Sequence, residues 1–223
     1  MSPDHLAAAM RALGGERWPV ADADTHVPPA AGLYAIYGGA DAWRDLDLPY
    51  QPTTPLYVGK SEDNLIRREL ETHFAASNTR RPQTGSSTIR RSFAALLHDA
   101  LDLHGVPRNP KRPGYFDKYR LLPDADARLT EWMHERLTIA VWAAPANLDT
   151  RLEKLEKAII DAWEPPLNLD GAPRPLPRLK TARKAMAAEA AHWAQHHADA
   201  TNQVIVAQLD DAGRRSLNAA KPD

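Results

Sequence analysis

The sequence predicts a mixed α/β (α+β) fold, in which helices flank a small three-stranded antiparallel sheet and a helical appendage follows at the C-terminus. Two short segments, 31–37 (AGLYAIY) and 56–59 (LYVG), are apolar and aromatic and are bounded by proline and glycine, as strands commonly are. A third segment of this kind occupies 137–144 (LTIAVWAA). Several other segments show the apolar spacing of helices.

Helix-capping residues and helix-breaking glycines and prolines predict the elements that lie between the strands. A first helix, His5–Leu13, ends at a pair of glycines. The connection 38–55 is rich in glycine and proline and must loop out between the first two strands, and 104–124 contains four prolines and is expected to be irregular. Further helices are expected from Ser61 or Asp63 to about Ala76, from Ser86 or Ser87 through Leu101, over Leu129–Leu137, over Leu148–Trp163, and from Lys180 to about Ala200.

This order divides the chain into three parts. Residues 1–30 form a lead-in, 31–170 form the main domain, and 171–223 form an alanine-rich, basic helical appendage with a tail. Prolines at 173, 175 and 177 make a stiff connector before the appendage.

Composition excludes several classes of protein. The chain has 28 Lys and Arg against 29 Asp and Glu, so a nucleic-acid partner has to be met by a local basic surface. The absence of cysteine excludes disulfide scaffolds, thiolate zinc sites and cysteine nucleophiles. No window approaches the roughly 18 apolar residues of a membrane span, and the N-terminus lacks the apolar core of a signal peptide. We therefore expect a soluble, cytoplasmic protein without membrane contact.

One carboxylate lies where a helix should be apolar. When 148–163 is projected at about 100° per residue, Glu156 falls inside the apolar arc that runs from Leu155 through Trp163 to Ile160. A desolvated carboxylate is costly unless a cation, a metal ion or hydrogen-bond donors lie beside it. Glu156 is therefore the first candidate for a functional acid, and a buried ion pair with an arginine is the alternative that periodicity leaves open.

The helix after the second strand is less distinctive. His73 falls among its apolar residues, where a histidine is commonly a packed, hydrogen-bonded core residue. Arg67 and Arg68 both belong to this helix, and the projection does not choose between them.

Together these residues resemble the GIY-YIG nuclease superfamily, which is named after two strand motifs. The motifs are 32–34 (GLY) and 57–59 (YVG). The family places an arginine and often a histidine or tyrosine on the next helix, and Arg68 and His73 fill these places. A metal-binding glutamate and a later asparagine correspond to Glu156 and Asn168. The family pattern thus selects the glutamate that the helix projection had selected.

The likeness covers 32–168, and it is greatest to bacterial GIY-YIG proteins that carry a Gly-Ser-Ser-Thr-x-Arg-Arg-Ser stretch, here Gly85–Ser92. Two features depart from the pattern. Tyr34 and Tyr57 are separated by a longer insertion than is usual between the two motifs. Arg68 and His73 are one residue further apart than in many members, which leaves Arg67 as a substitute.

The resemblance implies a divalent-metal-dependent endonuclease that hydrolyses phosphodiester bonds in DNA, leaving a 5′-phosphate and a 3′-hydroxyl. Glu156 would hold one Mg²⁺ or Mn²⁺, because a single carboxylate with water and substrate oxygens suits such hard cations. Arg68 would contact the scissile phosphate as a planar donor of several hydrogen bonds.

Tyr34 and Tyr57 are then the candidates for activating water. A tyrosine with a pKa of about 10 is a poor base near neutral pH unless nearby cations favour its phenolate. His73 would orient the water or a tyrosine, and Asn168 would fix the end of the Glu156 helix or the metal shell. A single strand tyrosine commonly serves only packing, so the tyrosines gain significance from the whole set.

A basic surface is visible between residues 78 and 120, which carry nine Lys and Arg and three Asp and Glu, a net charge of +6. Such a segment can neutralise several phosphates. Hydroxyls at a helix N-terminus beside it can donate to a phosphate. We expect nucleic-acid contacts at Lys60, Arg67, Ser87, Thr88, Arg90 and Arg91.

Alternatives remain for function and for a second site. The chain could bind nucleic acid without useful turnover, or it could bind another kind of partner while its basic face is incidental. A cut through both strands of a duplex would favour a homodimer, because each chain has one site. His192 and His196 have the i, i+4 spacing of metal ligands, but Trp193 stands where a zinc protease carries glutamate, which favours surface histidines.

Overall fold

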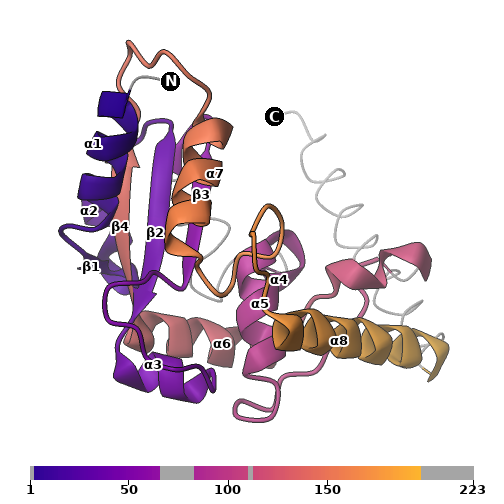
Figure 1. The fold of residues 1–223 in the computed structure, drawn as a ribbon. Coiled ribbons are helices and arrows are strands. Elements are labelled where there is room, and N and C mark those ends of the chain that lie inside the picture. Colours follow the sequence, from indigo (N-terminus) through magenta and orange to yellow (C-terminus); the bar gives the residue numbers. More distant parts are fainter. Residues whose placement is uncertain (1–2, 66–82, 110–112, 197–223) are drawn as a thin grey trace, which may run out of the picture.

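The computed structural model describes residues 3–65, 83–109 and 113–196 (Figure 1). In these residues β2 (Gly32–Gly38) is the central strand, and it pairs antiparallel with β3 (Tyr57–Ser61) on one side and β4 (Leu137–Ala143) on the other. Its first six residues are all buried, because helices cover both of its faces. This explains why the strand has no polar face in sequence. The predicted three-stranded antiparallel arrangement is confirmed.

A fourth strand extends the sheet beyond the prediction. β1 (Trp18–Pro19) pairs with the free edge of β4, which gives the strand order β1-β4-β2-β3. Two residues, of which one is a proline that donates no hydrogen bond, carry no alternating pattern that a sequence reading can detect. The first thirty residues also supply α1 (Pro3–Leu13), which packs on the sheet through Ala9 and Leu13.

The sheet separates two apolar layers. One face, which includes Leu33 and Ala35, packs against α1 and α7 (Leu152–Trp163), and Figure 1 shows both helices in front of the strands. The opposite face, which includes Tyr34 and Ile36, belongs to a larger core that continues into the helices below the sheet.

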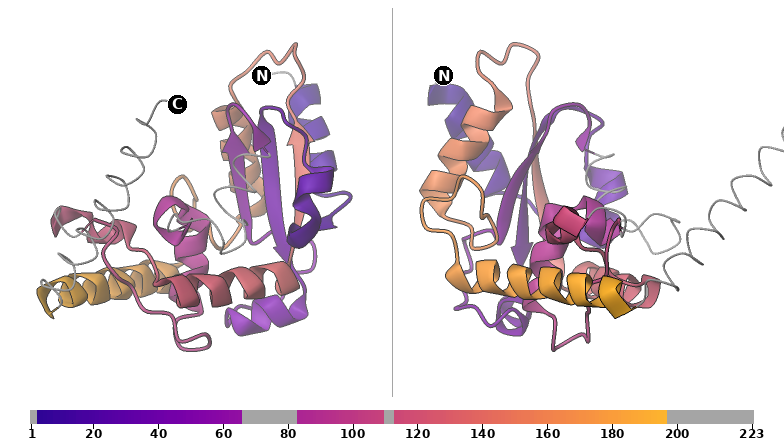
Figure 2. Two further views of the ribbon diagram at one scale, coloured as in Figure 1. Left: turned by 180° about the vertical axis from the view of Figure 1, so that it is seen from behind. Right: turned by 90° about the vertical axis from the view of Figure 1, so that its right-hand side faces the viewer.

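The remaining helices surround this larger core, as the two views of Figure 2 show. They are α2 (Ala23–His26), α3 (Ala40–Asp45), α4 (Gln83–Ser86), α5 (Thr88–Leu96), α6 (Pro123–Arg136) and α8 (Pro177–His196), with 3-10 turns at Val20–Asp22 and Pro113–Lys118. No helix in the described part of the chain is both long enough and apolar enough to span a membrane.

Several boundaries differ from the predicted ones. The insertion 38–55 contains a short helix, α3, whereas a loop was expected. α6 begins at Pro123, earlier than predicted, because a proline is well tolerated in the first turn of a helix. α7 begins at Leu152, one turn after the predicted start. The helix expected from Ser61 or Asp63 to about Ala76 lies mostly outside the described residues, although the Ser61 hydroxyl accepts a hydrogen bond from the Asn64 N–H at 3.1 Å.

A buried ion pair joins α5 to α6. Arg90 has no exposed surface, and its Nη2 donates to Asp126 Oδ1 at 2.6 Å and to Thr130 Oγ1 at 2.9 Å. Asp126 also accepts a hydrogen bond from the Thr84 hydroxyl, so the carboxylate connects α4, α5 and α6. Removal of one partner of a buried ion pair strongly destabilises a protein, because the other charge stays in the core without a counter-charge.

α8 is held against α5 and the loop that follows it. Leu179, Met186 and Ala190 are buried along one side of α8 and belong to the larger core. Gly105 lies against the helix backbone, since a Cβ at this position would be 2.3 Å from the Met186 carbonyl oxygen. Only glycine permits this approach, so α8 is fitted to the body of the protein along its length.

We expect Asp126→Asn to destabilise the protein by about 3–5 kcal/mol, because the Arg90 charge stays buried without its counter-charge. Chemical denaturation followed by circular dichroism measures this change. Asp124→Asn, on the exposed side of α6, is the control and should change stability by no more than about 0.5 kcal/mol. Equal effects of the two substitutions would show that the ion pair is not needed for folding.

Candidate functional site

Strand register brings the two motif tyrosines together. Tyr34 of β2 lies opposite Gly59 of β3, so Tyr57, two residues before Gly59, is on the same face of the sheet. The ring centroids of Tyr34 and Tyr57 are 6.1 Å apart. Tyr34 is buried with 1% of its surface exposed, whereas Tyr57 is only half-buried. The insertion between the two strands therefore does not prevent the pairing of the motifs.

Gly59 leaves room for Tyr34. A Cβ at Gly59 would lie 2.4 Å from the Tyr34 hydroxyl oxygen and 2.8 Å from the Tyr57 ring. The Tyr34 side chain thus passes across the glycine of the neighbouring strand, and its hydroxyl stays close to the Tyr57 ring. This is the physical reason for a glycine two residues after Tyr57.

Asn168 attaches the end of the α7 segment to β3. Its Nδ2 donates to the Val58 carbonyl at 2.8 Å, and its Oδ1 accepts from the Val58 N–H at 2.9 Å. The Leu167 N–H donates to the Leu56 carbonyl at 3.0 Å. The outer edge of β3 is therefore covered, and the chain that leaves α7 is held beside Tyr57.

A cavity of about 750 Å³ opens beside this edge. Tyr57, Glu156 and Asn168 all line it, so the structure brings these three predicted residues together. Glu156 is half-buried there, consistent with its place inside the apolar arc of α7. The other lining residues are Thr88, Arg151, Glu153, Lys154, Lys157, Ile160, Leu169, Asp170 and Gly171.

Lys60 adds positive charge next to the carboxylates of α7. Its ammonium pairs with Glu62, and this hydrogen bond raises the pKa of Lys60 above its usual value. The negative charges of Glu156 and Glu153 raise it further. Lys60 is therefore a cation near neutral pH and cannot serve as a base.

Three predicted residues, Arg67, Arg68 and His73, lie outside the described residues. The arginine that the family pattern places on the scissile phosphate therefore stays a prediction, as does the choice between Arg67 and Arg68.

The stretch Gly85–Ser92 divides into buried and accessible residues. Arg90 was expected to contact nucleic acid, but it is enclosed in the core by its ion pair with Asp126. Ser87 was expected there too, but it is fully buried, and its hydroxyl oxygen accepts from the Arg90 N–H as the N-cap of α5. Both expectations are corrected. Thr88 is half-buried and lines the cavity.

Arg91 has an unusual environment for a buried cation. Its guanidinium donates to the Gly85 carbonyl at 3.0 Å and to the Thr88 hydroxyl at 3.1 Å, but its Nε has no hydrogen-bond partner in the described part of the chain. Burial lowers the pKa of Arg91 to about 10, the positive charges of Arg183 and Arg108 act in the same direction, and Tyr119 and Asp117 act against them. Arg91, Arg183 and Arg108 therefore place three positive charges in this corner of the molecule, with Asp117 beside them.

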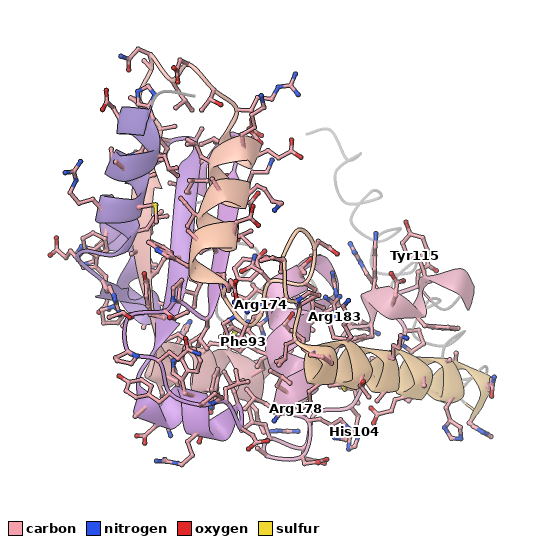
Figure 3. All side chains as sticks on the ribbon, in the orientation of Figure 1. Phe93, His104, Tyr115, Arg174, Arg178 and Arg183 are labelled. Carbon is pink, nitrogen blue, oxygen red and sulfur yellow. The ribbon has the colours of Figure 1, made fainter. Side chains whose placement is uncertain are left out.

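Arg183 comes from α8, and Figure 3 labels it beside the first part of that helix. The guanidinium also hydrogen-bonds Tyr119, a buried residue whose hydroxyl donates to the Arg91 carbonyl at 2.6 Å. α8 and α5 thus contribute to one positive region behind Thr88.

Sequence reasoning missed three cations that line the cavity, Arg151, Lys154 and Lys157. Lys154 and Lys157 belong to the charged face of α7, and such a helix face is usually solvated. The spacing of Lys157 from Glu153 was the available signal, because residues four apart lie on neighbouring parts of a helix surface.

The donor set of the cavity fits a hydrated divalent cation of the magnesium type. Glu156 and Glu153 offer carboxylate oxygens, and Tyr57 offers a phenol oxygen. Mg²⁺ and Mn²⁺ prefer such oxygens, and Mg²⁺ keeps several of its waters, for which the cavity has room.

A family model described as GIY-YIG catalytic domain matches residues 48–185 of the chain. The matched range contains β3, α5, α7 and Asn168 and ends within α8, whereas β2 with Tyr34 precedes it. No curated protein and no solved structure matches the chain.

We expect Gly59→Ser to destabilise the protein by about 1–3 kcal/mol, because the added atoms collide with Tyr34 and displace its hydroxyl. Thermal or chemical unfolding measures the loss. Gly39→Ser is the matched control: a Cβ at Gly39 meets nothing within 4 Å, and serine is favourable at the N-cap of α3. If both variants are equally stable, Tyr34 does not depend on a glycine at this position.

Proposed function

We propose, because the chain belongs to the GIY-YIG catalytic-domain family, that it is an endonuclease that hydrolyses phosphodiester bonds in DNA with one divalent cation. Membership of the family carries a nuclease-type function. The observation that supports the rest is the cavity at the edge of β3, which collects Tyr57, Glu156 and several cations.

Phosphodiester hydrolysis gathers negative charge on the phosphate oxygens and needs an activated water and a stabilised leaving oxygen. Glu156 would hold one Mg²⁺ or Mn²⁺, with Glu153 close enough to support it through water. When bound, the ion supplies charge stabilisation at the phosphate and acidifies water. Lys154 and Lys157 add positive charge for the substrate at the rim of the same cavity.

Tyr57 is the tyrosine that meets the substrate in this proposal. It lines the cavity, whereas Tyr34 is almost completely buried behind it. Tyr57 would accept a proton from the attacking water, with the surrounding cations favouring its phenolate. Tyr34 acts through its neighbour, by holding the Tyr57 ring against Gly59. Arg68, or Arg67 in its place, and His73 would complete the site from the segment after β3, which the sequence predicts to be helical.

DNA would extend from the cavity over the positive region of α5 and α8. Thr88 lines the cavity and accepts a hydrogen bond from Arg91, so the buried guanidinium lies directly behind the cavity wall. Arg108 is exposed and Arg183 is half-buried, so both offer donors to a phosphate. Because the net charge of the whole chain is −1, this local region has to supply most of the attraction.

We expect the parent protein to cleave DNA in the presence of Mg²⁺ or Mn²⁺, and Glu156→Ala and Tyr57→Phe each to lower the rate by at least about a hundredfold, since both remove a group that acts in the transition state. Glu131→Ala is the control, because Glu131 is an exposed carboxylate on α6 that does not line the cavity, and this variant should retain the parent activity. Duplex, single-stranded and branched DNA are assayed together with RNA, and folding is verified by circular dichroism.

Binding without cleavage by the parent would contradict the nuclease and leave a nucleic-acid-binding protein. Cleavage of RNA alone would overturn the choice of substrate. Arg67→Ala and Arg68→Ala, measured side by side, decide which arginine contacts the phosphate.

We expect Arg183→Ala to weaken DNA binding and to reduce the slope of log affinity against log salt by about 1, the effect of losing one phosphate contact. Fluorescence anisotropy with the cleavage-deficient Glu156→Ala background measures this over a range of salt. Arg44→Ala, an exposed arginine on α3, is the control and should leave the slope unchanged. An unchanged slope with Arg183→Ala would remove α8 from the DNA surface.

A further inference from the structure

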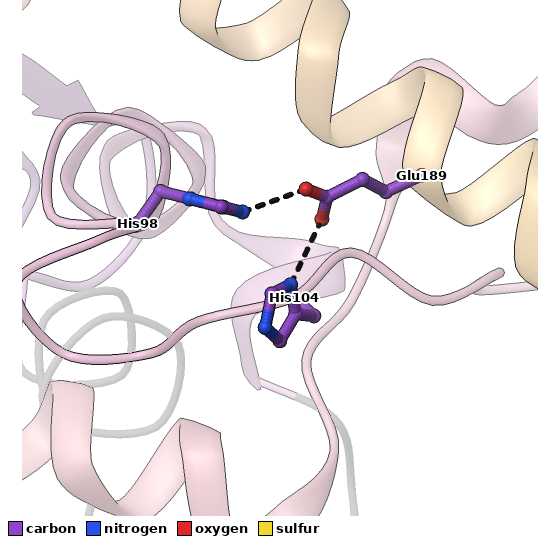
Figure 4. A group of neighbouring side chains, drawn as sticks. All are labelled: His98, His104 and Glu189. Carbon is purple, nitrogen blue, oxygen red and sulfur yellow. Dashed lines mark hydrogen bonds and ion pairs between the residues drawn. The ribbon is translucent and has the colours of Figure 1, made fainter.

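A group of histidine and glutamate side chains that could hold a metal ion lies outside the nuclease cavity, where the loop after α5 meets α8 (Figure 4). His98 Nε2 is 2.6 Å from Glu189 Oε1, and His104 Nδ1 is 3.5 Å from Glu189 Oε2. One nitrogen of each ring and one carboxylate oxygen lie within 4.8 Å of one another. None of the three residues lines the nuclease cavity.

The second ring nitrogen of each histidine also has a carboxylate partner. His98 Nδ1 is 2.6 Å from Asp99 Oδ1, and His104 Nε2 is 3.1 Å from Asp102 Oδ1. A carboxylate behind a histidine fixes the tautomer and the orientation of the ring, and histidines that bind metal ions almost always have such a partner. Both histidines therefore present the other nitrogen to the same point, which lies beside Glu189.

Glu189 is oriented as well. Its Oε2 accepts a hydrogen bond from the Gly105 N–H at 3.0 Å, and this leaves Oε1 directed at His98. The imidazole rings of His98 and His104 meet edge to face, with centroids 5.0 Å apart. The ligands come from two segments of the chain that contact each other where Gly105 meets α8, so the site joins them.

We propose that His98, His104 and Glu189 bind one zinc-type divalent ion, which fastens α8 to the loop after α5. Two imidazoles and a carboxylate form a common ligand set for zinc, with water in the fourth position. With bonds of about 2.0–2.1 Å, neighbouring ligand atoms of a tetrahedral site lie about 3.3 Å apart. The contact between His98 and Glu189 has to open by only about 0.7 Å, and Glu189, which is 34% exposed, has space to turn.

An ion pair without metal is the competing explanation. Burial of His98 lowers its pKa, but the hydrogen bonds with Asp99 and Glu189 outweigh this effect, and the pKa of His98 is raised. A protonated His98 between two carboxylates would explain the same contacts without a metal ion. Protons and zinc compete for the same nitrogen, so direct measurement of zinc separates the two explanations.

The test is the binding of Zn²⁺ to the full chain after removal of metal with a chelator, measured by calorimetry and by elemental analysis. We expect one zinc ion that still binds in Glu156→Ala, because the nuclease site is separate. His104→Ala and Glu189→Gln should each weaken binding by at least about a hundredfold, since each removes a ligand. Co²⁺ in place of zinc should give the visible absorption of a tetrahedral site.

Two further sets of variants keep the test independent of folding and of the other histidines. Asp99→Asn changes a carboxylate that is completely exposed, so it should leave the fold intact and weaken zinc binding by about 10–100-fold. The double change His192→Ala with His196→Ala removes the neighbouring histidine pair on α8 and should leave the affinity unchanged. A parent that binds no zinc, or a zinc ion lost only with His192 and His196, would overturn the proposal.

Discussion

The paired hydrogen bonds between the Asn168 side chain and the backbone of Val58 hold the candidate site together. An edge strand exposes a row of unpaired backbone groups, and Asn168 satisfies both groups of one residue at that edge. In doing so it fixes the end of the α7 segment beside β3. Glu156 from α7 and Tyr57 from β3 therefore share a cavity, although these elements are almost a hundred residues apart in sequence. The asparagine thus has a positioning role.

Two adjacent arginines illustrate how burial divides a basic motif between structure and function. Arg90 lies on the buried face of α5, and its charge is neutralised by Asp126. Asp126 thereby connects α4, α5 and α6. Arg91 is buried nearly as well, but its neighbours include Arg183 and Arg108, and its Nε is not satisfied by the described part of the chain. The first arginine stabilises the protein, and the second creates the positive field that the proposed DNA surface requires. α8, which supplies Arg183, is in turn positioned by contacts that converge on Glu189 and Gly105.

Much of the fold followed from local patterns, because β2 and β4 are continuous apolar segments, α7 has the apolar spacing of a helix, and breakers lie close to their ends. β1 escaped detection because two residues that include a proline carry no pattern, and α3 was hidden in a segment rich in glycine and proline. Within the site, Glu156 was identified by its position on the helix and Tyr57 by its motif. Arg151, Lys154 and Lys157 were missed, since a charged helix face is usually solvated, and only the cavity shows what they face.

The sequence by itself determined the three main strands, most of the helices and the residue types that the chemistry needs, because these depend on contacts between residues close along the chain. The two tyrosine motifs were expected in one sheet, and the structure adds the physical reason for their pairing, since Gly59 leaves room for Tyr34 on the neighbouring strand. Only the tertiary structure decided which of these residues are accessible. Burial depends on elements that meet from distant parts of the chain, and in this fold Ser87, Arg90 and Tyr34 are buried. The same tertiary contacts bring His98 and His104 to Glu189.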